Sequence, residues 1–458
     1  RSACRPSWRA ALRSWAAPCP LALYLGAIAL LTVAIAAGLL WPLHAGLAAD
    51  GERAWVLLVA TLLALLAASR LGVALVNWLA TLVATPHPLL RMDFSAGIPP
   101  QWRTLVVVPT LLTRADNVDE LVEALEVRFL ANRDRSLHFG LLTDLLDARQ
   151  ETLATDAALV ERARLAIAAL NRKYGDGRSG AEGDIFFLFH RPRRWNAKEG
   201  VWMGHERKRG KLAELNALLR GIPAAPGAGF ACVIGDTAAL SAVKFVITLD
   251  TDTQLPRDAA RALVAAMAHP LNRPRYDPAM RRVADGYGIL QPAVAVSLPG
   301  ASRSIYARLN SGEPGIDPYT RAVSDVYQDL FGEGSFVGKG IYDVEAFEHC
   351  LGDRFPPDRI LSHDLLEGCY VRSGLLSDVS LYEDYPARYG ADVSRRQRWI
   401  RGDWQLAAWL WPRVPVPCMR AGVDHGDDGQ GLCREPNPLS ALSRWKLFDN
   451  LRRSLVPA

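Results

Sequence analysis

Two aspartates, Asp250 and Asp252, follow an apolar run at residues 243–249. That run predicts a buried strand that ends on the first carboxylate, and side-chain alternation points the second to the same side. Paired carboxylates in this position suit Mg²⁺ or Mn²⁺, which bind through one or two carboxylates plus substrate phosphates. The pair therefore favours a nucleotide diphosphate as ligand, although aspartates at a strand end can also cap the next helix.

A third acid, Asp364, stands at the predicted start of a helix in the sequence Ser-His-Asp-Leu-Leu-Glu at 362–367. A helix terminus and a nearby cation can set the pKa of such a carboxylate for general-base work. A capping box is the alternative interpretation. The His363–Asp364 pair does not indicate a hydrolase, because no G-x-S-x-G nucleophile motif is present.

The segment 395–404 combines arginines with tryptophans. On a helix, Arg398 and Arg401 are neighbours that can clamp phosphate, and Trp399 offers a flat surface to a sugar ring. The glycine-rich segment 332–340 matches neither a P-loop nor a dinucleotide-binding fingerprint. It predicts a tight turn, or a loop whose backbone approaches a bulky polar ligand.

Strands alternate with helices after residue 91, which predicts a mostly parallel α/β sheet. We expect strands at 103–110, 137–144, 185–190 and 243–249, and helices at 118–130, 156–173 and 208–220. Ligands bind beyond the carboxyl ends of strands in such sheets. Pro109, Asp144 and Asp250 would all lie at that edge.

The first ninety residues have a different character. Between residues 21 and 84 only Asp50, Glu52, Arg53 and Arg70 are charged. Two stretches, at about 21–43 and 54–84, are long enough to cross a bilayer core of about 30 Å. Arginines before the first and after the second place both flanks in the cytosol. A signal peptide or a buried soluble hairpin are the alternatives.

The composition excludes several classes of protein. The 458 residues carry a formal charge of +5, and basic residues mostly alternate with acidic ones, so no nucleic-acid footprint is present. The seven cysteines are scattered without a C-x-x-C spacing, which predicts unpaired thiols and no zinc site. We divide the chain into a membrane region at 1–90, a cytosolic domain at 91–415, and an interfacial or linker segment at 416–458 that leads toward further membrane helices.

These motifs occur in the order seen in processive, membrane-bound, inverting glycosyltransferases of the cellulose and chitin synthase type. Longer strings, among them MDFSAGIPP, LVEALEVRFLANRD, GIDPYTRAVSDVYQDLFGEGSFVGKGIYD and SRRQRWIRGDWQ, resemble the glycosyltransferase domain of bacterial cyclic β-1,2-glucan synthases. The resemblance covers roughly residues 75–415.

The resemblance implies a type A glycosyltransferase fold, a Rossmann-like mixed sheet, with N-terminal transmembrane and C-terminal interfacial helices. It implies a multi-pass protein of the bacterial inner membrane that transfers glucose from UDP-glucose to a growing β-1,2-glucan in the cytosol, with Mg²⁺ or Mn²⁺. By position, Asp364 would be the catalytic base, and Asp250 and Asp252 would hold donor and metal. Further donor contacts would come from Pro109, Thr110, Asp144, Lys208, Asn216, Arg398 and Trp399. The acceptor side would include Gly334, Ser335, His363 and Glu367.

The sequence departs from the broader pattern in three places. Leu111-Leu112-Thr113 replaces a Tyr-Asn-Glu sequence, Ser-His-Asp replaces Thr-Glu-Asp, and Arg395 stands where Gln is usual. Two other functions stay open, a synthase of another β-linked polysaccharide and a catalytically idle sugar-nucleotide-binding module. In the resembling family a phosphorylase-like region trims the product, and this sequence does not contain it.

Overall fold

A computed structural model describes residues 19–47, 54–175, 183–223, 229–311, 320–321, 324–360, 363–418 and 432–456. The chain folds into two compact units whose segments alternate along the sequence. The first unit contains the described residues up to His87, those of 319–333, and those from Ser440 onward. The second contains those of 88–318 and 334–439.

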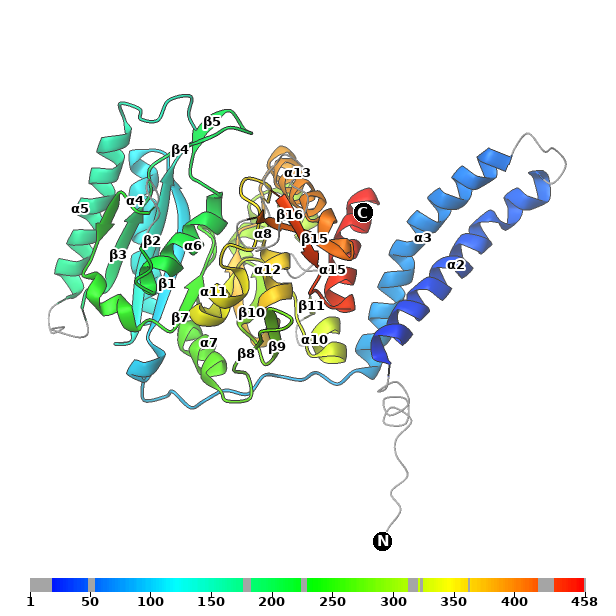
Figure 1. The fold of residues 1–458 in the computed structure, drawn as a ribbon, viewed down its shortest axis with the longest axis horizontal. Helices are drawn as coiled ribbons and strands as arrows, with labels where there is room; N and C mark the ends of the chain where they lie inside the picture. The colour runs from blue at the N-terminus through cyan, green and yellow to red at the C-terminus, as the bar shows by residue number, and fades with distance from the viewer. Residues whose placement is uncertain are drawn as a thin grey trace, which may run out of the picture. The chain divides into compact units, whose positions relative to one another are not determined.

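The second unit is built on an eight-stranded mixed sheet with the order β14-β10-β13-β7-β1-β2-β3-β6 (Figure 1). The strands are β1 (Thr104–Leu112), β2 (Leu137–Leu145), β3 (Phe186–His190), β6 (Cys232–Ile234), β7 (Phe245–Thr248), β10 (Ile289–Val296), β13 (Gly340–Asp343) and β14 (Ser373–Glu383). Strands β7, β1, β2 and β3 run parallel, while β13 is antiparallel to both of its neighbours. The predicted α/β class is confirmed in this mixed form.

The helices follow the apolar periodicity of the sequence. They are α4 (Ala115–Ala131), α5 (Asp156–Tyr174), α6 (Arg207–Leu219), α7 (Ala259–Ala268), α8 (Leu298–Ser302), α9 (Ile305–Asn310), α11 (Val344–Leu351), α12 (Asp364–Val371) and α13 (Tyr389–Gln405). Helices α4, α5 and α7 share one core with alternate residues of β1, β2 and β7, because apolar side chains recur about every 3.6 residues along the helices and at every second residue along the strands. All seven predicted strands and helices of residues 103–249 are present to within a few residues.

Three small hairpins complete this unit. They are β4 (Arg194–Asn196) with β5 (Val201–Met203), β8 (Arg275–Asp277) with β9 (Arg282–Asp285), and β15 (Arg413–Pro417) with β16 (Leu432–Pro436). The last hairpin corrects the prediction of unpaired cysteines, because it brings Cys418 and Cys433 together as a disulfide. The pairing depends on the β15–β16 register, which cysteine spacing along the sequence does not reveal.

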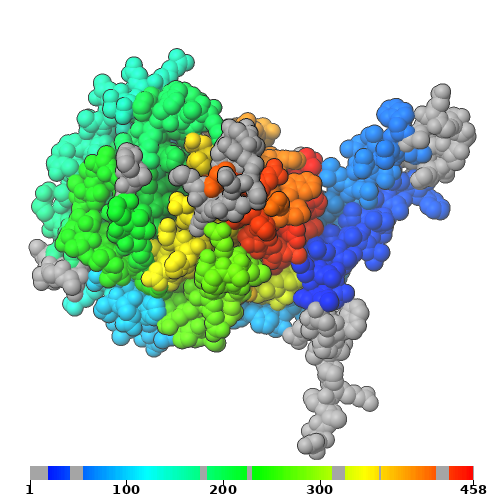
Figure 2. All heavy atoms as spheres, viewed as in Figure 1, coloured from blue at the N-terminus to red at the C-terminus, as the bar shows by residue number. Residues whose placement is uncertain are grey.

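The first unit contains the two apolar helices α2 (Pro20–Leu47) and α3 (Ala54–Val83). Both are long and apolar enough to cross a membrane, and many of their apolar side chains are exposed. Figure 2 draws the two helices, in blue, with all their heavy atoms as spheres. The hairpin β11 (Thr320–Arg321)–β12 (Ser324–Asp325) leads into helix α10 (Val326–Phe331), and helix α15 (Ala441–Leu455) ends the described chain. Tyr24 of α2, Val76 of α3, Tyr327 of α10 and Leu442 of α15 share one buried cluster. The sequence did not indicate that 320–333 would join the apolar helices.

Candidate active site

The Asp250-Thr251-Asp252 turn follows β7 at the carboxyl edge of the parallel strands. Arg128 of α4 holds this turn by donating to the carbonyl oxygens of Thr251 and Thr253, at 2.9 and 2.8 Å. Burial lowers the pKa of Arg128 to about 10, against the opposing charge of Asp252. The residue before α7 is Asp258, so the two aspartates do not cap that helix. The capping alternative for this pair is therefore not supported.

A third carboxylate, Glu383 at the end of β14, joins Asp250 and Asp252. One ligand oxygen from each of the three lies within 4.8 Å of the others. Glu383 is buried, and the Thr253 hydroxyl donates to its Oε1 at 2.8 Å. Sequence analysis missed Glu383, which lies 131 positions after Asp252. The local feature that could have indicated Glu383 is its position as an acid at the end of a largely apolar strand.

Two lysines neutralise part of this carboxylate group. Lys208 Nζ donates to Asp250 Oδ1 and to the carbonyl of Gly338, both at 2.7 Å. Lys339 Nζ lies 3.1 Å from Asp250 Oδ2 and 2.5 Å from Glu383 Oε1. Burial alone would raise the pKa of Asp250, but these two ammonium groups lower it to about 2. Lys208 was predicted from the sequence, whereas Lys339 was not.

Asp252 has the opposite electrostatic environment. Burial, followed by the charges of Glu383 and Asp250, raises the pKa of its carboxyl group. Four acids, Asp250, Asp252, Glu383 and Asp364, lie near two lysines, Lys208 and Lys339. Together these six side chains carry a charge of −2. Hard oxygen ligands with two uncompensated negative charges fit one divalent cation. Asp250, Asp252 and Glu383 are the residues that can hold it.

Asp364 begins α12 and faces Gly338. A Cβ atom at position 338 would lie 2.7 Å from Asp364 Oδ2. The backbone φ of Gly338, +87°, also favours glycine. Asp364 Oδ1 is buried and has no hydrogen-bond partner among the described residues. Its negative charge, together with that of Asp250, raises the pKa of Lys208 despite the effect of burial. The structure therefore places a carboxylate oxygen that accepts no hydrogen bond from the described residues near Lys208, the lysine that binds Asp250.

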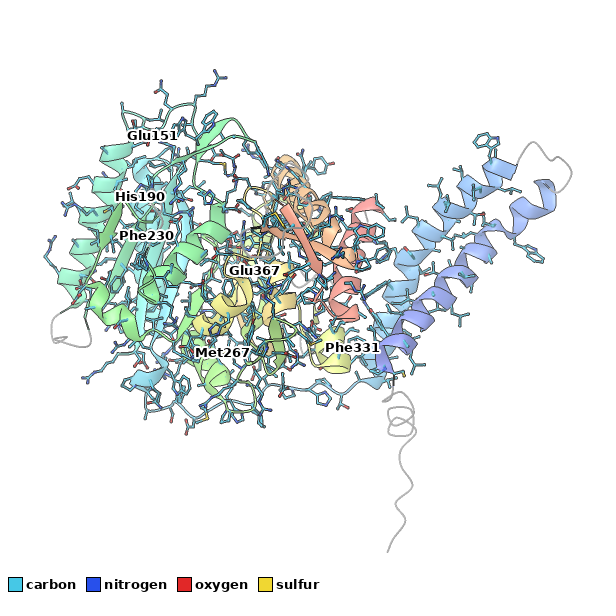
Figure 3. All side chains as sticks on the ribbon, in the orientation of Figure 1. Glu151, His190, Phe230, Met267, Phe331 and Glu367 are labelled. Atoms are coloured by element: carbon cyan, nitrogen blue, oxygen red, sulfur yellow. A yellow bond between two sulfur atoms is a disulfide. The ribbon has the colours of Figure 1, made fainter. Side chains whose placement is uncertain are left out.

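His363 and Glu367 lie directly behind this carboxylate. His363 Nδ1 is 2.8 Å from Glu367 Oε1 and 3.7 Å from Asp364 Oδ1, and Figure 3 labels Glu367. Burial lowers the pKa of His363, but the charges of Glu367 and Asp364 outweigh it and raise the pKa overall. The residue before α12 is His363, whose side chain makes no capping bond, so the described residues show no capping box. Ser362 lies outside the described residues.

The predicted acceptor-side residues Gly334 and Ser335 pack against the start of β14. Gly334 N donates to the Ser373 carbonyl, and the Ser373 hydroxyl donates to the Gly334 carbonyl, both at 2.8 Å. A Cβ atom at Gly334 would lie 2.9 Å from the backbone nitrogen of Leu375. Ser335 is buried. Close backbone packing accounts for the glycine, and an acceptor role for the two residues stays a prediction.

The predicted donor residues Pro109, Thr110 and Asp144 lie on neighbouring strands at one edge. Arg191 forms a two-pronged ion pair with Asp144, at 2.8 and 2.9 Å. Lys211 Nζ lies 3.2 Å from Asp144 Oδ2 and donates to the Thr110 carbonyl at 2.5 Å. The Thr251 hydroxyl donates to the Thr110 hydroxyl at 3.3 Å, so this edge is continuous with the carboxylate turn.

Three of the remaining predicted residues lie in other surroundings. Asn216 is fully buried in α6 and accepts a hydrogen bond from the Tyr342 hydroxyl at 2.9 Å. Arg398 and Trp399 are exposed on α13, where Arg395 lies 4.8 Å from the centre of the Trp399 ring. Their donor contacts stay predictions.

The same edge contains a buried histidine with a testable effect on stability. His190, labelled in Figure 3, ends β3 and lies 2.9 Å from the Thr143 hydroxyl. Burial lowers the pKa of His190 to about 4. The unfolded chain therefore binds a proton more readily between about pH 6.5 and 4, so the stability from this group is present above that range and is lost as the pH falls.

We expect His190→Gln to weaken the acid sensitivity of the fold. The lowered pKa corresponds to about 3 kcal/mol lost between pH 6.5 and 4. Thermal melting of both proteins in detergent at pH 7.5, 6 and 5 measures the effect. The melting temperature of the variant should fall less with pH, and equal slopes would contradict a neutral buried His190.

The chain is similar in sequence to a known synthase. No family model matches the chain. Over 402 residues the chain is 45% identical to the cyclic β-(1,2)-glucan synthase NdvB of Rhizobium meliloti (strain 1021). The resemblance to cyclic β-1,2-glucan synthases is confirmed. The match covers 87% of this chain and 13% of the length of NdvB, so the chain corresponds to one segment of a much larger synthase.

Proposed function

We propose that the chain is the glucosyltransferase segment of a cyclic β-1,2-glucan synthase, which extends a β-1,2-glucan from UDP-glucose with inversion. The observation that supports this most directly is the Asp364 carboxylate, whose Oδ1 has no hydrogen-bond partner among the described residues, next to the group formed by Asp250, Asp252, Glu383, Lys208 and Lys339. The eight-stranded mixed sheet, with this group at the edge of its parallel strands, supports a type A glycosyltransferase fold.

The proposed reaction divides the work between two sides of the site. On the acceptor side, Asp364 takes the proton from a glucan hydroxyl as that oxygen bonds to the anomeric carbon of the donor. The bond from that carbon to the diphosphate breaks on the opposite side, and UDP leaves with the bonding electrons. Attack opposite the leaving group converts an α-linked donor into a β-linked product.

The donor side supplies positive charge where the leaving group becomes negative. Lys208 lies between Asp250 and Gly338, within reach of a diphosphate bound at this turn. A divalent cation held by Asp250, Asp252 and Glu383 would add electrophilic stabilisation of the leaving phosphate. We assign the uridine to the edge formed by Pro109, Thr110 and Asp144, and the acceptor side to His363 and Glu367.

We propose that α2 and α3 anchor the segment in the inner membrane as part of a multi-pass protein, with the catalytic unit in the cytosol. Two apolar helices of sufficient length support the membrane assignment. The growing glucan, the lipid bilayer and the remaining regions of the synthase, including its phosphorylase-like region, are the partners that this proposal requires.

Incubating membranes that contain the chain with labelled UDP-glucose and Mg²⁺ tests the proposal. We expect labelled polymer with β-1,2 linkages by methylation analysis, and none when EDTA replaces Mg²⁺. A different linkage would favour a synthase of another β-glucan. Saturable donor binding without any transfer would favour a catalytically idle module.

A further inference from the structure

The apolar helix α3 carries one arginine, Arg70, within its membrane-spanning stretch. That stretch, Trp55–Val83, has 29 residues and is about 44 Å long, whereas a bilayer core is about 30 Å thick. Trp55 is 68% exposed and suits the membrane interface. A core that begins at Trp55 would place Arg70 about 22 Å deep, or about 8 Å before the opposite boundary. Arg70 can then extend its guanidinium to the headgroups.

Helix α15 brings Arg452 to the same level of α3. Arg452 Nη1 donates to the hydroxyl of Ser69 at 3.0 Å, and Arg70 Nη1 donates to the carbonyl of Val456 at 2.6 Å. Arg453, the neighbour of Arg452, lies with its Nε 3.5 Å from Asp449 Oδ2. We call Arg70, Arg452 and Arg453 the arginine cluster.

One buried acid pairs with two arginines of this cluster. Asp449 is fully buried, and its Oδ1 accepts from Arg452 Nη2 at 2.5 Å. Three guanidinium groups against one carboxylate leave a charge of +2 for these four residues. The same helix, α15, also presents apolar side chains that could contact lipid acyl chains. Phe448 and Leu455 are 46% and 54% exposed.

We propose that the arginine cluster binds the phosphate headgroup of an anionic glycerophospholipid. Guanidinium groups bind phosphate with paired, charge-assisted hydrogen bonds. The negative surface of the cytoplasmic leaflet adds attraction at this depth. Free phosphate offers the same charge, but the adjacent apolar helix and exposed apolar side chains favour a ligand with acyl chains. The site is independent of the proposed transferase chemistry.

Native mass spectrometry of the whole chain tests this site. The chain is released from detergent micelles that contain phosphatidylglycerol or phosphatidylcholine with identical acyl chains. We expect several-fold more retained phosphatidylglycerol than phosphatidylcholine, and we expect Arg70→Gln with Arg453→Gln to remove that preference. These substitutions leave the Arg452–Asp449 ion pair in place, so no buried charge loses its main partner.

Arg257→Gln provides the matched control, because Arg257 lies in the other unit, has a side chain that is 89% exposed and forms an ion pair with Asp258. This variant should keep the preference for phosphatidylglycerol. Equal retention of both lipids by the unaltered chain, or a preserved preference in the double variant, would overturn the proposal. Displacement of the lipid by millimolar inorganic phosphate would also overturn it, in favour of a free-phosphate site.

Discussion

Asp364→Asn is expected to abolish glucosyl transfer while UDP-glucose binding survives. The amide has almost the same shape as the carboxylate but cannot accept the acceptor proton, so the rate should fall by at least about 10²- to 10⁴-fold. Donor binding should persist because Asp250, Lys208 and Lys339 keep their contacts. Transfer is measured with labelled UDP-glucose, and binding is measured by calorimetry on the same preparation.

The geometry around Gly338 makes this substitution a clean test. Asp364 Oδ1 has no hydrogen-bond partner among the described residues, so the amide breaks no hydrogen bond of that oxygen, although it loses the ion pair with His363 Nδ1 at 3.7 Å. Asp258→Asn is the matched control, since Asp258 is an exposed acid that precedes α7. It should leave both transfer and binding unchanged. Lost donor binding with residual turnover in Asp364→Asn would refute the assignment of Asp364 as the base.

The sequence predicted much of this site because its strands are locally encoded. Strand β1 is a continuous apolar run, and Asp144 and Asp250 each lie at or just after the end of such a run. Parallel pairing then brings those ends to one edge. Local patterns therefore sufficed to predict the four strands β1, β2, β3 and β7 and to group Asp144, Asp250 and Asp252.

The missed residues depend on contacts between distant segments. Glu383 and Lys339 meet Asp250 because β13 and β14 belong to the same sheet as β7, an arrangement that no local periodicity encodes. The same reason applies to the Cys418–Cys433 disulfide, which depends on hairpin register. Asn216 was assigned by position in a motif, and its hydrogen bond to Tyr342 appears only in the folded chain.

Asp252→Ala is expected to remove metal-dependent donor binding. Lysines neutralise Asp250 and Glu383 in the structure, whereas Asp252 has a raised pKa caused by burial and by the charges of Glu383 and Asp250. Asp252 is therefore the acid with most to gain from a divalent cation. Loss of this ligand should weaken Mn²⁺ binding by at least about 10- to 100-fold, the range known for supporting residues of metal sites.

Two readouts separate this effect from general damage to the site. Mn²⁺ titration followed by electron paramagnetic resonance reports metal binding without donor, and calorimetry with UDP-glucose reports donor binding with and without Mg²⁺. The Asp252→Ala protein should lose the difference between the two calorimetric values, whereas Asp258→Ala should retain it. Unchanged Mg²⁺-dependent binding in Asp252→Ala would contradict the assignment of Asp252 as a metal ligand. Donor binding that does not depend on Mg²⁺ in the unaltered chain would instead show that the protein itself balances the negative charge at this turn. Because Lys339 already bridges Asp250 and Glu383, Lys339 would then be the residue that replaces the cation.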